Sequence, residues 1–286
     1  MRSKFKFIFY SIHKFSKYPL HFFFGFLYIK LFGSIKNKIR YDVFRIPHYA
    51  FGIYEAALRA KELNFSKITV IEFGVANGRG LLAMVKYADK IAAALNIEIQ
   101  VIGFDSGEGM PKHEGYKDHP ELYVQGDFPM QDPTNLRKLL PDTARLIIAN
   151  LNSDDWTKYV AEDAPIGFIS VDVDYYSSTI NLFKHLHTIE VNKILPNALF
   201  YLDDVYLDNH NPYQGELLAM NEFNQASTVR KFDPYYIKLK QKQKFYNEPW
   251  LSQIYQFHSF DHPIRSKPYR KEDENARMLG NKYLKL

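Results

Sequence analysis

The stretch Ile68-Thr-Val-Ile-Glu72-Phe-Gly74-Val-Ala-Asn-Gly78-Arg-Gly80 joins an apolar, β-branched run to three glycines. Such a run is typical of a strand buried on both faces of a parallel sheet. Glycines directly after it let the backbone approach a ligand and present N–H groups at the start of a helix. Their spacing, Gly-x-x-x-Gly-x-Gly, differs from the Gly-x-Gly-x-x-Gly of dinucleotide binding. The stretch therefore predicts a strand, a ligand-binding turn and a helix.

Strand-like and helix-like patterns alternate along the rest of the chain. This alternation predicts an α/β domain with a mostly parallel sheet and helices on both faces. We expect the domain at residues 46–262, after an N-terminal extension (1–45) and before a polar C-terminal tail (263–286). Further strands are predicted at 97–104, 145–151, 166–173, 198–202, 228–237 and 253–260, and helices at 49–63, 81–95, 135–140, 155–161, 178–189 and 214–223.

The N-terminal extension carries the basic character of the chain. Residues 1–40 hold nine Lys or Arg and no acidic residue, which leaves 28 basic and 32 acidic residues in 41–286. The same forty residues hold nine Phe and three Tyr. The apolar run at 20–32 is shorter than the roughly 20 residues that span a bilayer. Two interpretations stay open, a peripheral membrane anchor or a segment that packs on the domain or in a homo-oligomer contact. No recognition motif accompanies the charge, so we expect no nucleic-acid partner.

The chain contains no cysteine, which excludes disulfides, thiolate metal sites and cysteine nucleophiles. This composition fits a reducing compartment. We expect a cytoplasmic protein, peripheral on the inner face of the membrane if the extension is an anchor.

Acidic residues follow the second predicted strand and the two strands predicted at 166–173 and 198–202. Asp105, followed by Ser106, is placed to accept hydrogen bonds from ribose hydroxyls, and Glu72 to meet a ligand's amine. Parallel strands end at one edge of a sheet, so Asp172, Asp203 and Asp204 are expected to converge there. Converging carboxylates repel one another unless they are protonated or share a cation, and oxygen ligands favour Mg²⁺. Asp174 is open to two interpretations, a cap for the following helix or a catalytic base.

These motifs together resemble the macrocin O-methyltransferase-type family. The resemblance rests on Val70-Ile-Glu-Phe-Gly74, Gly103-Phe-Asp-Ser106, the segment 172–179 and Leu202-Asp-Asp204, and covers residues 65–225. It implies a Rossmann-like, class I methyltransferase with a seven-stranded sheet, S-adenosylmethionine, magnesium and a sugar hydroxyl as acceptor. Matching the family's motifs, the cofactor residues are Glu72, Gly74, Gly78, Asp105 and, more weakly, Ser153 and Asp154; the metal ligands are Asp172, Asp203 and Asp204.

The resemblance leaves the catalytic base and the acceptor open. Methyl transfer to a sugar hydroxyl needs a proton acceptor, and the candidates are His113, His119 and Asp174. The long segment 105–131 is predicted to be a functional loop beside the site. Two other functions are compatible with the same crevice. One is an NAD-dependent sugar oxidoreductase, which the glycine spacing disfavours; the other is a non-catalytic scaffold, which the retained acidic residues disfavour.

Overall fold

The computed structural model describes residues 18–151, 153–206 and 209–266. Seven strands form one sheet in the order β3-β2-β1-β4-β5-β7-β6. The first five are parallel, and β7 runs antiparallel to both β5 and β6. This confirms the predicted mostly parallel, seven-stranded, Rossmann-like sheet. The strands are β1 (Lys67–Phe73), β2 (Glu98–Asp105), β3 (Ala144–Ile148), β4 (Ile166–Val171), β5 (Ile194–Leu202), β6 (Arg230–Pro234) and β7 (Ile254–Ser259).

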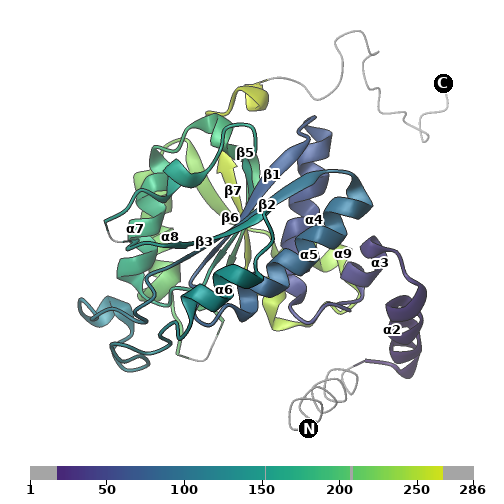
Figure 1. Cartoon of the computed structure of the whole chain (residues 1–286), viewed down its shortest axis with the longest axis horizontal. Helices are drawn as coiled ribbons and strands as arrows, with labels where there is room; N and C mark the ends of the chain where they lie inside the picture. The colour runs from purple at the N-terminus through teal and green to yellow at the C-terminus, as the bar shows by residue number, and fades with distance from the viewer. Residues whose placement is uncertain (1–17, 152, 207–208, 267–286) are drawn as a thin grey trace, which may run out of the picture.

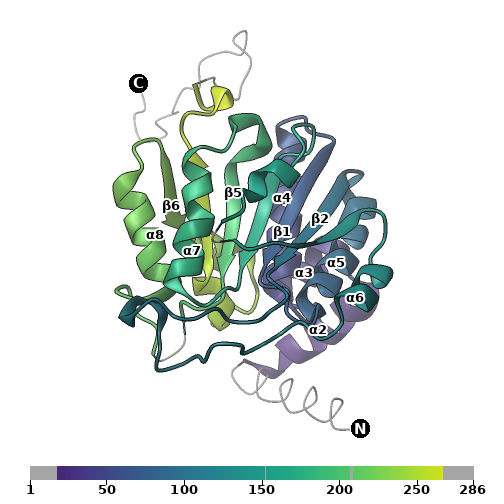
Figure 2. The same ribbon diagram turned by 60° about the vertical axis from the view of Figure 1, so that its left-hand side comes forward.

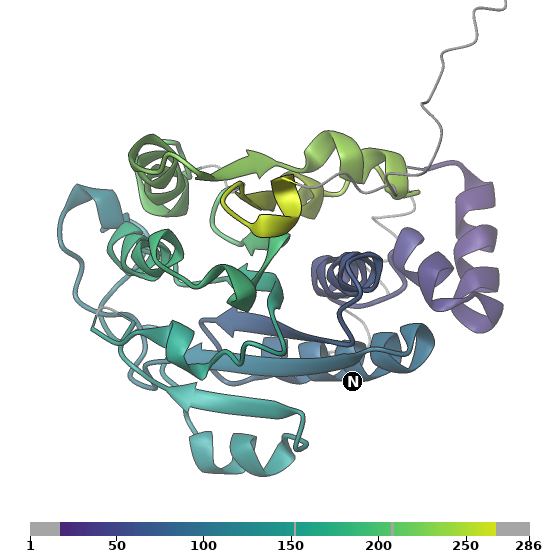
Figure 3. The same cartoon turned by 90° about the horizontal axis from the view of Figure 1, so that it is seen from above.

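Helices cover both faces of the sheet (Figures 1 and 3). On one face α4 (Pro47–Glu62) and α5 (Arg79–Leu95) pack together, with α4 against β4 and α5 against β2. On the other, α7 (Tyr176–Lys184) packs beside α8 (Gly215–Ala226). Each face has its own apolar core, and β1 and β4 are buried along almost their whole length. Packing on both faces therefore fixes the positions of the strand ends and of the side chains that they carry.

Two predicted elements differ in the structure. The helix predicted at 155–161 is only a 3-10 turn, Trp156–Tyr159. The strand predicted at 228–237 ends at Pro234, and α9 (Tyr236–Lys242) follows at once. Proline has no N–H with which to extend a strand ladder, which explains the early end. The remaining short elements are α6 (Pro133–Leu139) and 3-10 turns at Tyr116–Asp118, His185–His187, Val191–Lys193, Pro249–Ser252 and Pro263–Ser266.

Within the residues described from position 18 onward, two helices precede the domain, α2 (Leu20–Phe32) and α3 (Ile35–Arg40). Ile39 of α3 belongs to the core, and the Trp250 Nε1–H donates to Asp42 Oδ2 at 3.3 Å. In contrast, no residue of α2 is buried, and Figures 1 and 2 show this helix projecting from the body. No helix in the described ranges is both long and apolar enough to cross a membrane. The basic residues before position 18 and the tail after position 266 lie outside the described residues.

Candidate active site

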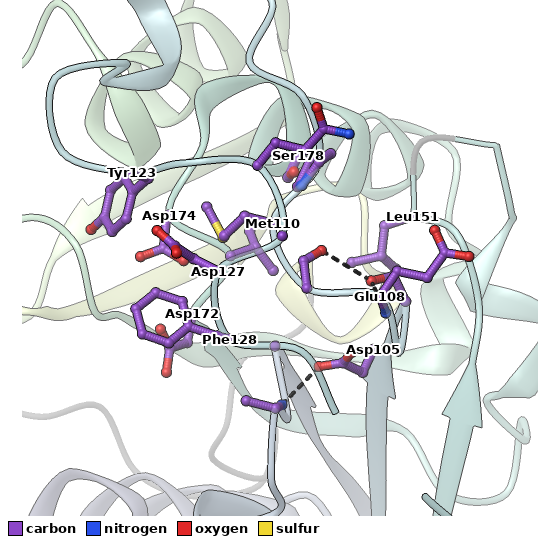
Figure 4. Close-up of a pocket in the computed structure, with 18 of the residues that line it drawn as sticks. Asp105, Glu108, Met110, Tyr123, Asp127, Phe128, Leu151, Asp172, Asp174 and Ser178 are labelled. Carbon is purple, nitrogen blue, oxygen red and sulfur yellow. Dashed lines mark hydrogen bonds between the residues drawn. The ribbon is translucent and has the colours of Figure 1, made fainter. Parts of the chain in front are cut away.

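A cavity of about 630 Å³ opens at the carboxyl ends of β1, β2, β4 and β5. This volume suits a cofactor together with part of a second ligand. Figure 4 shows its two sides, with Asp105 on one and Asp172, Asp174 and Tyr123 on the other. The expected loop at 105–131 supplies much of the remaining wall, including Met110. Two backbone hydrogen bonds of Met110 hold that loop in shape: its N–H donates to Asp127 O and its O accepts the N–H of Gly126, both at 2.8 Å.

The turn after β1 requires its glycines. Gly74 has φ of +85°, and a Cβ there would lie 1.7 Å from the backbone oxygen of Asp172. Gly78 is left-handed at the start of α5, where a Cβ would lie 2.5 Å from Leu136 Cδ1. Any other residue at either position would be both strained and blocked. Gly74 lines the cavity with Ala76, so this backbone does come close to the cavity.

Asp105 closes the turn from the side of β2. Its Oδ2 accepts the N–H groups of Val75 and Ala76, both at 2.8 Å, and its Oδ1 accepts Gly107 N–H at 2.6 Å. A carboxylate has about four lone-pair directions, so one remains for a ligand hydroxyl. Asp105 and Ser106 both line the cavity. Asp105 therefore organises the two loops in addition to facing the cavity, a role that the sequence did not indicate.

Glu72 lies behind the turn and is not among the residues that line the cavity. It is 2% exposed, and the hydroxyl of Tyr49 donates to its Oε1 at 2.6 Å. Burial raises the pKa of this carboxyl to about 8, against the opposing effect of the Tyr49 hydrogen bond. Its Oε2 is buried and has no hydrogen-bond partner among the described residues. The expected contact of Glu72 with a ligand's amine stays a prediction.

The wall beside β3 is formed by Asn150 and Leu151. Ser153 and Asp154 are not among the lining residues. They stabilise the turn after β3 through hydrogen bonds to the backbone of Asn150. Both of their N–H groups donate to Asn150 O, and Asp154 Oδ2 accepts Asn150 N–H at 2.9 Å. The expected contacts of Ser153 and Asp154 with an adenine ring stay a prediction.

The acidic residues at the ends of β4 and β5 converge as the sequence predicted. Asp172, Asp203 and Asp204 each present a carboxylate oxygen within 4.8 Å of the others. Burial, and then repulsion from Asp203 and Asp204, raises the pKa of Asp172 well above its ordinary value. Burial, and then repulsion from Asp174, raises that of Asp204 to about 9. Such a cluster is costly without a positive partner.

Glu216, on the first turn of α8, is a fourth carboxylate that sequence reasoning missed. It is fully buried, and its Oε2 accepts the backbone N–H of Asp204 at 3.2 Å. Burial, followed by repulsion from Asp204, raises the pKa of Glu216 well above its ordinary value. Glu216 Oε1 and Asp204 Oδ2 are buried without a hydrogen-bond partner among the described residues. Three converging aspartates, with the buried Glu216 behind Asp204, fit a hard divalent cation such as Mg²⁺.

Asp174 lies on the cavity wall next to the cluster. Its φ of +58° places a non-glycine residue in the left-handed region, where strain is often retained for function. Tyr123 and Asp204 are within hydrogen-bonding reach of its carboxyl group. Burial raises the pKa of Asp174 above its ordinary value. Asp174 thus lines the cavity and has an increased proton affinity. It does not cap the following helix, because Tyr175 occupies the N-cap position of α7.

The two loop histidines lie away from the cavity wall. His113 is exposed in the loop. His119 is fully buried, with its Nδ1 3.0 Å from Glu121 Oε1 and its ring 5.2 Å from that of His210. His210 in turn places Nε2 3.6 Å from Asp204 Oδ1. His119 therefore supports the wall behind the acidic cluster, and Asp174 is the best-placed candidate base.

No protein-family model and no curated protein matches the chain. Among solved structures it is similar to the calicheamicin methyltransferase CalS11, with 18% identity, TM-score 0.45, and coverage of 60% of this chain and 69% of that one. It is also similar to the O-methyltransferase NovP, with 18% identity, TM-score 0.44, and coverage of 63% and 72%. A third is TomG from Streptomyces achromogenes, an O-methyltransferase involved in tomaymycin synthesis, with 11% identity, TM-score 0.37, and coverage of 65% and 71%. The function proposed below rests on this chain's own residues.

Proposed function

We propose that this protein is an S-adenosylmethionine-dependent O-methyltransferase that binds a divalent cation and acts on a hydroxyl of a sugar or glycan acceptor. The observation that carries the proposal is the two-sided cavity. One side has the glycine turn and a carboxylate at the end of β2, which suit a nucleoside. The other has Asp172 and Asp203 on its wall with Asp204 close to both, an acidic group that suits a cation and an oxygen ligand.

When bound, S-adenosylmethionine supplies a methyl group that is already activated by the positive sulfur. The chain must then align the acceptor oxygen and accept its proton. Gly74, Asp105 and Ser106 line the nucleoside side. Asp172, Asp203 and Asp204 would hold Mg²⁺, which lowers the pKa of a bound hydroxyl, with Glu216 behind them.

Asp174 is the proposed proton acceptor. It lines the cavity beside the acidic cluster, and its raised pKa brings its proton affinity closer to neutral pH. Tyr123 Oη donates to Asp204 Oδ1 at 3.0 Å, so its ring has a fixed position at the same side. Phe128 is 60% exposed and lines the same cavity, where it provides an apolar face for a sugar ring.

The acceptor class rests on the resemblance described above. We also propose that the enzyme works in the cytoplasm, in keeping with the absence of cysteine. The segments 126–130, 165–170 and 215–219 resemble a bacterial branch of that family associated with surface-polysaccharide loci, so we propose that the acceptor belongs to surface-polysaccharide synthesis.

Thermal unfolding with S-adenosylmethionine, NAD and Mg²⁺ tests the cofactor. We expect the unfolding midpoint to rise with S-adenosylmethionine and with Mg²⁺. A rise with NAD alone would assign the cavity to an oxidoreductase, and no rise with either nucleotide would favour a non-catalytic scaffold. Transfer of a labelled methyl group to nucleotide-sugar and polysaccharide fractions then tests the acceptor. Label found only in other fractions would contradict the sugar assignment.

A further inference from the structure

Helix α2 carries a continuous apolar face that nothing in the described structure covers. Its 13 residues, Leu-His-Phe-Phe-Phe-Gly-Phe-Leu-Tyr-Ile-Lys-Leu-Phe, are hydrophobic almost all round, yet none is buried. A helix of this composition is normally enclosed by its own protein or by another apolar phase. The exposed apolar side chains recur at helical spacing along one face, at Leu20, Phe24, Leu27, Tyr28 and Leu31.

The opposite face of α2 attaches the helix to the domain. Phe22 and Phe26 are half-buried, with ring centroids 5.8 Å and 6.4 Å from that of Phe245. Gly25 allows the helix to approach Tyr41, because a Cβ there would lie only 3.3 Å from Tyr41 Cε1. Phe245 itself is fully buried. The inner face therefore orients α2, and its outer face is presented to the surroundings: Phe24, Tyr28 and Leu31 are 62–67% exposed.

The positive charge of the N-terminal extension indicates what kind of partner covers the outer face of α2. No acidic residue precedes Asp42, whereas nine basic residues lie within positions 1–40. Of these, Lys30 lies on α2, and Lys36, Lys38 and Arg40 lie on α3. A second copy of the same face would bring two positive segments together, which is unfavourable. An anionic lipid surface offers both the apolar phase and the opposite charge.

The length of α2 determines how it meets that surface. Thirteen residues at 1.5 Å each extend about 20 Å, short of the roughly 30 Å hydrocarbon core of a bilayer. We propose that α2 lies in the interface of an anionic membrane, with the side chains of Phe24, Tyr28 and Leu31 inserted among the lipids and the basic residues at the headgroups.

The test is sedimentation of the full chain with vesicles of phosphatidylcholine alone or with roughly a third phosphatidylglycerol. We expect binding to the mixed vesicles that weakens with salt. Phe24→Ser with Leu31→Ser should lower this binding about tenfold or more. The matched control, Leu139→Ser with Val229→Ser, changes two exposed apolar residues elsewhere and should bind as the unmodified chain does. Lys36→Gln with Lys38→Gln should lower binding to the mixed vesicles roughly fivefold for each lysine removed.

Two further measurements test whether the double variant still folds and whether α2 itself enters the lipid. The unfolding midpoint of Phe24→Ser with Leu31→Ser should match that of the unmodified chain, because the two side chains are 62% and 67% exposed. Phe24→Trp should give fluorescence that brominated lipids quench, since Trp156 and Trp250 are buried. Equal vesicle binding by the double variant, absence of quenching, or a lipid-free dimer that the double variant loses would overturn the proposal. The last result would assign the face to a second copy of the chain, and none of these outcomes bears on methyl transfer.

Discussion

The backbone N–H of Asp204 donates to Glu216 Oε2 at 3.2 Å, which joins the end of β5 to the first turn of α8. This bond holds the backbone of Asp204, a residue of the proposed cation site, and places the buried carboxylate of Glu216 behind it. Groups behind a metal ligand commonly change metal affinity by 10–100-fold.

Glu216→Gln should therefore weaken Mg²⁺ binding about tenfold without unfolding the protein. Glutamine can still accept the Asp204 N–H but carries no charge. Calorimetric titration with Mg²⁺ measures the change. Glu222→Gln, on the same helix but paired with Lys117, is the control and should keep the original affinity. Unchanged affinity in Glu216→Gln would remove this residue from the site.

Asp203→Asn should abolish the rise in unfolding midpoint that Mg²⁺ produces. The amide oxygen can still accept the hydrogen bond of Tyr201, so the variant should fold. What it loses is the charge shared with Asp172 and Asp204. Asp127→Asn provides the control, since Asp127 lines the cavity but is not one of the three clustered acidic residues. A Mg²⁺-dependent shift that survives in Asp203→Asn would refute the proposed ligation.

The strand ends were predictable because their chemistry is local. Buried apolar runs identify β1, β2, β4 and β5, and parallel strands bring Asp105, Asp172 and Asp203 to one edge whatever the rest of the fold does. The glycine positions were predictable for the same reason, since Gly74 and Gly78 stand directly after a strand.

Residues that act through tertiary burial could not be predicted. Glu216 is an ordinary polar residue in the first turn of an amphipathic helix, and only packing of α8 near the end of β5 places it behind Asp204. Asp105 looked like a ligand-binding residue, whereas its three hydrogen bonds to backbone N–H groups depend on how two loops fold together. His119 looked like a loop residue and proved to be fully buried.

Asp174→Asn should lower the rate of methyl transfer by about 10²–10⁴ if Asp174 accepts the acceptor's proton. Affinity for S-adenosylmethionine should stay within about threefold, because Asp105 is at the other side of the cavity from Asp174 (Figure 4). His113→Asn is the matched control: this histidine is exposed and off the cavity wall, so its rate should be unchanged. If the rate of methyl transfer fell strongly in His113→Asn and stayed normal in Asp174→Asn, His113 rather than Asp174 would be the proton acceptor.

Glu72 should make the protein less stable as the pH rises. Its pKa is raised to about 8 in the folded chain, against an ordinary value of 4.5, so the folded state holds a proton that the unfolded state has released. Between these two pH values one such proton lowers the free energy of unfolding by up to about 1.4 kcal/mol per pH unit. Glu72→Gln removes the titration and keeps an acceptor for the Tyr49 hydroxyl. We therefore expect the free energy of unfolding to fall less between pH 6 and pH 8 in this variant, measured by urea denaturation with a chelator present. Equal slopes in the two proteins would mean that Glu72 is already ionised in the folded protein.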